Sequence, residues 1–75
     1  MFPTEEIQRL LETGLPGAQV RVAGDGHHFE AVVVTEAFAG KSRIQRHQMV
    51  YAALGGRMGN EIHALSLKTL APGEQ

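Results

Sequence analysis

A glycine-flanked turn between two strand-like segments restricts the fold of this chain more than any other feature of its sequence. Residues 19–22 (QVRV) alternate polar and apolar side chains, which is typical of a half-buried strand. Residues 28–35 (HFEAVVVT) are largely apolar and β-branched, which predicts a second, more buried strand. Gly24-Asp25-Gly26 stands between them and is a strong turn signal. Because the connection is short, we predict that the two strands form an antiparallel hairpin.

A short helix is predicted before the hairpin. Thr4 is a good N-cap residue, and the two glutamates that follow it complement the helix dipole. Apolar residues then recur at helical spacing until the glycines and the proline of residues 14–17 interrupt the pattern. We therefore predict a first helix over residues 4–13, capped by Thr4.

A longer helix is predicted after the hairpin. Residues 36–41 form a connection with room for one helical turn, and Ser42 with Gln45 three positions later predicts a capping box. Gly55-Gly56 weakens the helix, and Gly59-Asn60 ends it. A stripe along the helix indicates the side that packs on the core, and it consists of Ile44, His47, Val50, Tyr51 and Leu54.

A third strand is predicted at residues 62–68 (IHALSLK), followed by a loose tail over residues 70–75. The order of elements is then α-β-β-α-β. The helix between the second and third strands is long enough for a crossover, so these strands should run parallel. A right-handed crossover places both helices on one face of the sheet. We expect one domain over residues 1–75, of the α/β (α+β) class, with a three-stranded mixed sheet whose other face is open.

Composition excludes several classes of function. With 75 residues, the chain has room for one thin core and no deep active site. It contains no cysteine, so it offers no disulfide and no thiolate, which is compatible with the cytoplasm as its expected location. We find no signal-peptide pattern and no apolar run long enough to span a membrane. Nucleophile-elbow and phosphate-loop motifs are also absent from the sequence, so we do not expect an enzyme.

The charge pattern keeps nucleic-acid binding as an alternative. The net charge is −1, which argues against binding by bulk charge. Lys41, Arg43 and Arg46 nevertheless cluster near a helix N-terminus, where they form either an anion or DNA contact or an ordinary solvated face. Binding of single-stranded RNA in the manner of KH domains is disfavoured. The expected G-x-x-G loop reads FAGK at residues 38–41, and the literal match at residues 56–59 follows the long helix.

Histidines supply the candidate metal ligands. His28 opens the second predicted strand, and His63 lies at the start of the third. Because neighbouring parallel strands begin at the same end of a sheet, about 4.8 Å apart, we predict that both imidazoles lie at one rim, within reach of a shared metal. His27 is the alternative to His28, and an ordinary exposed histidine is the alternative to either ligand. His47 lies on the helical stripe, so we predict that it packs beside the core.

Three segments together resemble the signature of the BolA-like family. Residues 24–29 (GDGHHF) are similar to the short hairpin loop of its IbaG-type branch. Residues 33–51 (VVTEAFAGKSRIQRHQMVY) and residues 61–69 (EIHALSLKT) resemble its two longer motifs. The joint pattern covers nearly the whole chain and is specific.

This resemblance implies a fold similar to a type II KH domain and a non-enzymatic role in iron–sulfur cluster and iron homeostasis. Family members pair with a monothiol glutaredoxin and share a [2Fe–2S] cluster, for which glutaredoxin and glutathione supply thiolates. On the family pattern, His63 is the leading ligand, and His28 matches the loop position of the second. Without cysteine, this chain offers only the imidazole side of such a site, so no cluster is expected on the isolated chain.

Two other functions remain as alternatives at this stage. Some members of the family are described as transcription regulators that bind DNA, which fits the cluster of Lys41, Arg43 and Arg46. Weak self-association through the open sheet face is the third hypothesis.

Overall fold

The computed structural model describes residues 2–55 and 64–74. Along these residues the elements are α1 (Thr4–Gly14), β1 (Gln19–Gly24), β2 (His28–Val34), the 3-10 turn η1 (Glu36–Phe38), α2 (Arg43–Leu54) and β3 (Ala64–Leu70). This is the predicted α-β-β-α-β order, and η1 is the predicted helical turn in the connection. No helix of the described ranges is both long and apolar enough to cross a bilayer.

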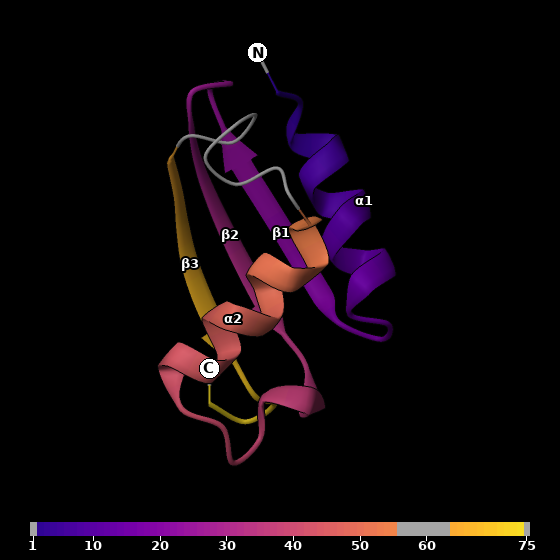
Figure 1. Cartoon of the computed structure of the whole chain (residues 1–75), viewed down its shortest axis with the longest axis vertical. Coiled ribbons are helices and arrows are strands. Elements are labelled where there is room, and N and C mark those ends of the chain that lie inside the picture. Colours follow the sequence, from indigo (N-terminus) through magenta and orange to yellow (C-terminus); the bar gives the residue numbers. More distant parts are fainter. Residues whose placement is uncertain (1, 56–63, 75) are drawn as a thin grey trace.

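The sheet has the predicted mixed topology. Its strand order over the described residues is β1-β2-β3, with β1 antiparallel and β3 parallel to β2. Figure 1 shows α1 and α2 on the same side of the sheet. The turn between β1 and β2 lies at one end of the molecule, and α2 begins at the other (Figure 1). The antiparallel hairpin, the parallel crossover and the one-sided helical layer are therefore confirmed.

The core lies between the sheet and the two helices. Alternate residues of β2 point into it, as expected for a strand with one covered face. The most deeply buried large side chains come from every layer, and they are Phe29, Phe38, Ile7, Leu11, Leu54, Val33 and Val50. Gly14 allows α1 to approach α2 closely, since a Cβ atom there would lie 2.6 Å from the Cβ of Ala53. A side chain at this position would push the two helices apart.

The start of α1 differs from the prediction. Pro3, not Thr4, is the N-cap residue, and its carbonyl accepts the backbone N–H groups of Glu6 and Ile7. Pro3 has an extended backbone, so Thr4 is already the first helical residue. The Thr4 hydroxyl donates to the Glu5 carboxylate instead of accepting from the helix. The predicted cap by Thr4 is therefore wrong, although the bounds of the helix are nearly as predicted.

The predicted capping box of α2 is present. The backbone N–H of Gln45 donates to Ser42 Oγ at 3.1 Å, and the Ser42 N–H donates to Gln45 Oε1 at 2.9 Å. The helix ends at Leu54, and its C-cap is Gly55, whose φ of 66° is a conformation that glycine adopts without steric cost. The predicted helix end near residues 56–60 lies outside the described residues.

The predicted core stripe of α2 is only partly correct. Val50 and Leu54 are buried, but Ile44 is 73% exposed and Tyr51 is 39% exposed. The row that faces the core at four-residue spacing runs through Arg46, Val50 and Leu54. The pattern included Val50 and Leu54 but missed Arg46, because hydrophobic periodicity counts arginine as a surface residue.

The C-terminal end is also more ordered than a loose tail. β3 continues to Leu70, and Ala71 is buried. Glu74 accepts two hydrogen bonds from the Arg46 guanidinium, at 2.7 and 3.1 Å, and one from the backbone N–H of Ala71 at 2.9 Å. A charged pair between two distant segments thus fastens this end of the chain to α2. The predicted first residues of the strand, Ile62 and His63, lie outside the described residues.

Candidate metal centre

A single carboxylate organises the turn between β1 and β2. Asp25 Oδ1 accepts the backbone N–H groups of His27 and His28, both at 2.8 Å. These two hydrogen bonds stabilise the charged form and lower the pKa of Asp25 to about 2. Asp25 is therefore ionised at neutral pH and fixed in orientation by the backbone.

His28 stands at the first position of β2 with its ring in solvent. Its side chain is 82% exposed, and its Nδ1 atom lies 3.7 Å from Asp25 Oδ2. Since the other carboxylate oxygen is already bound by backbone amides, Oδ2 is the one left to face the imidazole. Metal-bound histidines usually direct their second ring nitrogen at a carboxylate, a carbonyl or a water. The donor chemistry of His28 therefore fits a ligand that binds through Nε2.

The contact with Asp25 distinguishes His28 from His27. Both side chains belong to exposed residues, but among the described histidines only the His28 ring has a carboxylate contact. The sequence pattern around Asp25 predicts only a turn residue. The sequence signal for its contact with the His28 ring was its position three residues before that histidine, in a turn that brings the backbone back to the carboxylate.

The second predicted ligand, His63, lies outside the described residues. The register shows that Ala64, the first residue of β3, pairs with His28. A shallow hollow of about 350 Å³ spans this region, lined by residues from the turn and from the starts of β2 and β3. The placement of His63 beside His28 remains a prediction. Within residues 2–55 and 64–74, no group of three or more histidine, aspartate or glutamate side chains converges on one point.

Comparison with known proteins identifies the family. The family model for BolA-like proteins matches residues 12–74. This chain belongs to the BolA-like protein family. It is 43% identical over 70 residues to the acid stress protein IbaG of Escherichia coli K12, covering 92% of this chain and 83% of that protein.

Two further similarities come from a solved structure and a curated relative. A BolA protein homologue from Coxiella burnetii superposes with a TM-score of 0.86 at 51% identity, covering 96% of this chain and 94% of that one. The DNA-binding transcriptional regulator BolA of Escherichia coli K12 is 38% identical over 47 residues, which are 63% of this chain and 45% of that protein.

Arg46 of this BolA-like protein does not lie free for an anion, unlike the sequence expectation. Its side chain is only 12% exposed and pairs with Glu74. Its Nε donates to the Lys41 carbonyl at 3.0 Å, its Nη1 to the Thr69 carbonyl at 3.1 Å, and its guanidinium lies 5.8 Å from the centre of the Phe38 ring. Of the three clustered cations, Lys41 and Arg43 keep exposed side chains, whereas Arg46 holds the fold together.

His47 is half-buried and does not join the core as the stripe suggested. Its ring meets the Tyr51 ring edge-on, with centroids 6.3 Å apart and an angle of 78° between the planes. Ile44 lines the same outward hollow of α2 as these two rings. This side of α2 is therefore a surface.

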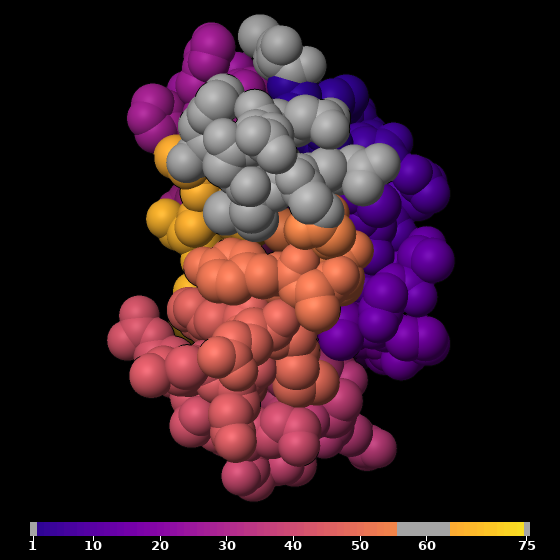
Figure 2. All heavy atoms as spheres, viewed as in Figure 1, coloured from indigo at the N-terminus to yellow at the C-terminus, as the bar shows by residue number. Residues whose placement is uncertain are grey.

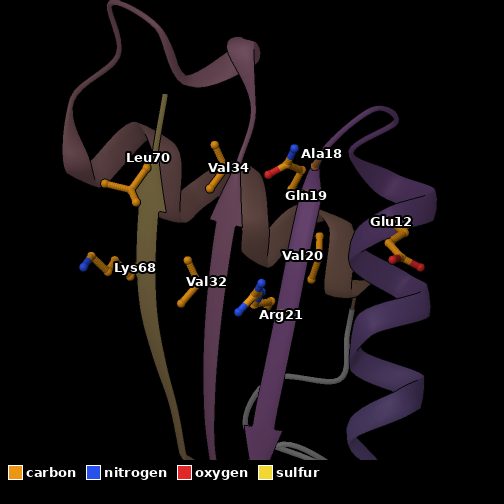
Figure 3. A pocket seen from close by; sticks show the side chains of 9 residues that line it. All are labelled: Glu12, Ala18, Gln19, Val20, Arg21, Val32, Val34, Lys68 and Leu70. Atoms are coloured by element: carbon orange, nitrogen blue, oxygen red, sulfur yellow. The ribbon is translucent and has the colours of Figure 1, made fainter. Parts of the chain in front are cut away.

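The open sheet face of the BolA-like fold is present as predicted. Paired residues of neighbouring strands form rows across it, and Arg21, Val32 and Lys68 make one such row. Figure 3 shows these side chains on the face of the sheet opposite α2. They belong to the lining of a hollow of about 730 Å³, to which Glu12 also contributes. Cations and a carboxylate thus share a largely aliphatic floor.

Proposed function

We propose that this BolA-like protein is a non-enzymatic cytoplasmic adaptor that shares a [2Fe–2S] cluster with a monothiol glutaredoxin. The observation that carries the proposal is the exposed His28 ring with an ionised carboxylate at its Nδ1 side. His63 is the other proposed ligand. The cluster is cargo, and the glutaredoxin and glutathione supply the thiolates that this chain lacks.

Each group at this rim has a definite task in the proposal. In this proposal the Asp25 carboxylate, 3.7 Å from Nδ1 of His28, favours a proton on that nitrogen and so leaves Nε2 as the nitrogen that faces the partner. The backbone amides of the turn hold the Asp25 carboxylate in place, and the carboxylate in turn orients the His28 ring. An imidazole must be unprotonated at the nitrogen that binds the metal. Sharing of the cluster with the glutaredoxin should therefore weaken in mildly acidic solution.

A spectroscopic titration tests this function. Mixing with the cluster-loaded glutaredoxin should shift the visible absorption and circular dichroism of the cluster. His63→Ala should abolish the shift, and His28→Ala should weaken it. His27→Ala and His47→Ala are the matched controls and should leave it in place. An unchanged spectrum on mixing the wild-type proteins would refute the proposal.

DNA binding is the second candidate function, because one relative is named a DNA-binding transcriptional regulator. The exposed cations available for phosphate are Lys41 and Arg43. Such binding should weaken steeply as salt increases, because bound counterions are released from DNA. A fluorescence anisotropy titration of duplex DNA at low salt, with wild type and with Lys41→Glu/Arg43→Glu, tests it. No binding, or binding that survives the double charge reversal, would dismiss this candidate.

A further inference from the structure

The outward side of α2 carries an apolar surface. Among the described residues, the large hydrophobic side chains that are exposed are Ile44 and Tyr51. They stand seven positions apart, on the same side of the helix, with His47 between them. A hollow of about 640 Å³ runs over this side, and its lining, here called the α2 patch, consists of Ser42, Arg43, Ile44, His47, Gln48 and Tyr51. Figure 2 shows α2 fully outward over the middle and lower part of this face.

A cationic groove adjoins the α2 patch. It has a volume of about 470 Å³ and lies between the start of α2 and the second half of β3. Arg43 and His47 line both hollows, so the two form one continuous surface. Lys41 and Lys68 contribute further positive charge to the groove.

Carboxylates are missing from this combined surface, as far as the described residues show. Neither hollow has an aspartate or glutamate in its lining, and the sequence of α2 contains none. The carboxylate of Glu74 is bound by Arg46 and does not neutralise Lys41 or Arg43. The surface therefore has an apolar centre with a positive flank.

The start of α2 lies far from the candidate metal ligand. Arg46 fastens the start of α2 to the carbonyl of Thr69, which pairs with Val33 of β2. Val33 is five residues along β2 from His28, which at about 3.3 Å per residue is about 17 Å. Figure 1 shows the β1–β2 turn and the start of α2 at opposite ends of the molecule. A protein that binds at the His28 rim can therefore leave the start of α2 open.

We propose that the α2 patch and the cationic groove bind an acidic segment of a second partner protein. An aliphatic or aromatic side chain of that segment seats against Ile44 and Tyr51, while flanking carboxylates meet Lys41 and Arg43. Charge complementarity sets the acidic character of the partner, and the apolar centre favours a protein over a polyphosphate backbone. Tyrosine, arginine and buried apolar anchors are the side chains that dominate protein interfaces.

The α2 patch and the cationic groove share no lining residue with the hollow at the His28 rim, so binding there does not depend on the proposed cluster function.

A peptide titration followed by NMR tests this assignment. The probe is a short synthetic peptide with aspartates on both sides of a central Leu-Phe pair, added to the full-length ¹⁵N-labelled protein. Amide shifts should concentrate in residues 43–51 and 67–69 and spare residues 25–28. Ile44→Ser should weaken binding at least about tenfold, whereas His28→Ala should leave the affinity unchanged. Because Ile44 is 73% exposed, its substitution should preserve the fold, which the unfolding midpoint checks.

Two comparison probes decide the class of partner. The same peptide with alanines in place of Leu-Phe should bind more weakly, and so should a DNA oligonucleotide of equal charge. The proposal is overturned by an absence of peptide binding, by equal binding of DNA, or by an affinity that Ile44→Ser does not change. Shifts confined to the open sheet face would overturn it as well.

Discussion

The two ends of this small sheet are each organised by one carboxylate, with different results. At the hairpin end, Asp25 holds two backbone amides with one oxygen and faces His28 with the other. At the opposite end, Glu74 holds the Ala71 amide with one oxygen and the Arg46 guanidinium with both. Both carboxylates have a pKa lowered to about 2 by their hydrogen bonds.

The partner of each carboxylate decides what the arrangement does. Arg46 is always charged, is mostly buried and also binds two carbonyls. Its pairing with Glu74 therefore stabilises the packing of the C-terminal segment on α2. His28 is exposed and has a nitrogen left over, so Asp25 orients a side chain that can still bind something else. The same carboxylate chemistry therefore fixes a mostly buried guanidinium at one end and faces an exposed imidazole at the other.

The largest expected effect comes from removing the ring beneath Arg46. Phe38 is fully buried, and Phe38→Ala should destabilise the protein by about 3–5 kcal/mol, from lost burial and the cavity left behind. Denaturant unfolding measures this loss. His28→Ala is the comparison at the other end and should change stability by less than about 0.5 kcal/mol, because its side chain is exposed. Equal losses would contradict the assignment of the two ends.

Replacing Arg46 by lysine should give the next largest effect. Lysine keeps the charge but cannot pair with both oxygens of Glu74 while also binding the carbonyls of Lys41 and Thr69. The midpoint of thermal unfolding should fall by several degrees. Arg43→Lys is the matched control on the exposed side of the same helix, and its midpoint should not move. A stable Arg46→Lys protein would show that the guanidinium geometry is dispensable.

Acid should loosen the Glu74 end in a defined pH window. The pKa of Glu74 is lowered from 4.5 to about 2, chiefly by Arg46. Its contribution to stability is therefore complete above pH 4.5 and is lost as the pH falls from 4.5 towards 2. Glu74→Gln should flatten the part of the stability–pH curve that belongs to this group, whereas Glu5→Gln should not. An acid profile identical to wild type would exclude the pair as its cause.

Asp25→Asn should give the smallest change in stability. It should, however, change which ring nitrogen of His28 carries the proton. Asparagine can still accept the backbone amides through its oxygen, while its NH₂ group would face Nδ1 as a donor. The neutral ring should then shift from Nδ1–H towards Nε2–H. Ring ¹⁵N and ¹³C chemical shifts measure this ratio, with Glu30→Gln as the control. An unchanged ratio would mean that the carboxylate does not orient the ring.

Local patterns in the sequence predict most of the fold. The hairpin, the capping box at Ser42 and Gln45, and the parallel crossover follow from turn chemistry, capping chemistry and loop length, which act over a few residues. The row of α2 that faces the core was missed in part, because Arg46 occupies a core-facing position. Its partner Glu74 lies 28 residues away in the chain, so the sequence near Arg46 does not predict the ion pair.

The candidate site could also be predicted only in part from the sequence. The position of His28 at a strand start and the parallel pairing with β3 follow from topology alone. The role of Asp25 does not, because it depends on a turn geometry that brings a carboxylate back to the ring. The exposure of Ile44 and Tyr51 was likewise hidden, since apolar residues at helical spacing predict a core side whichever way the helix is rotated.

The pairing of Arg46 with Glu74 also bears on how the protein is prepared. A chain shortened before residue 74 loses the only carboxylate bound to this guanidinium in the described part of the molecule. The released charge would stand beside Lys41 and Arg43 and raise the affinity of that side for any polyanion. DNA binding by the shortened protein would therefore include a contribution from the released Arg46 charge, and nucleic-acid affinity should be measured with Glu74 present.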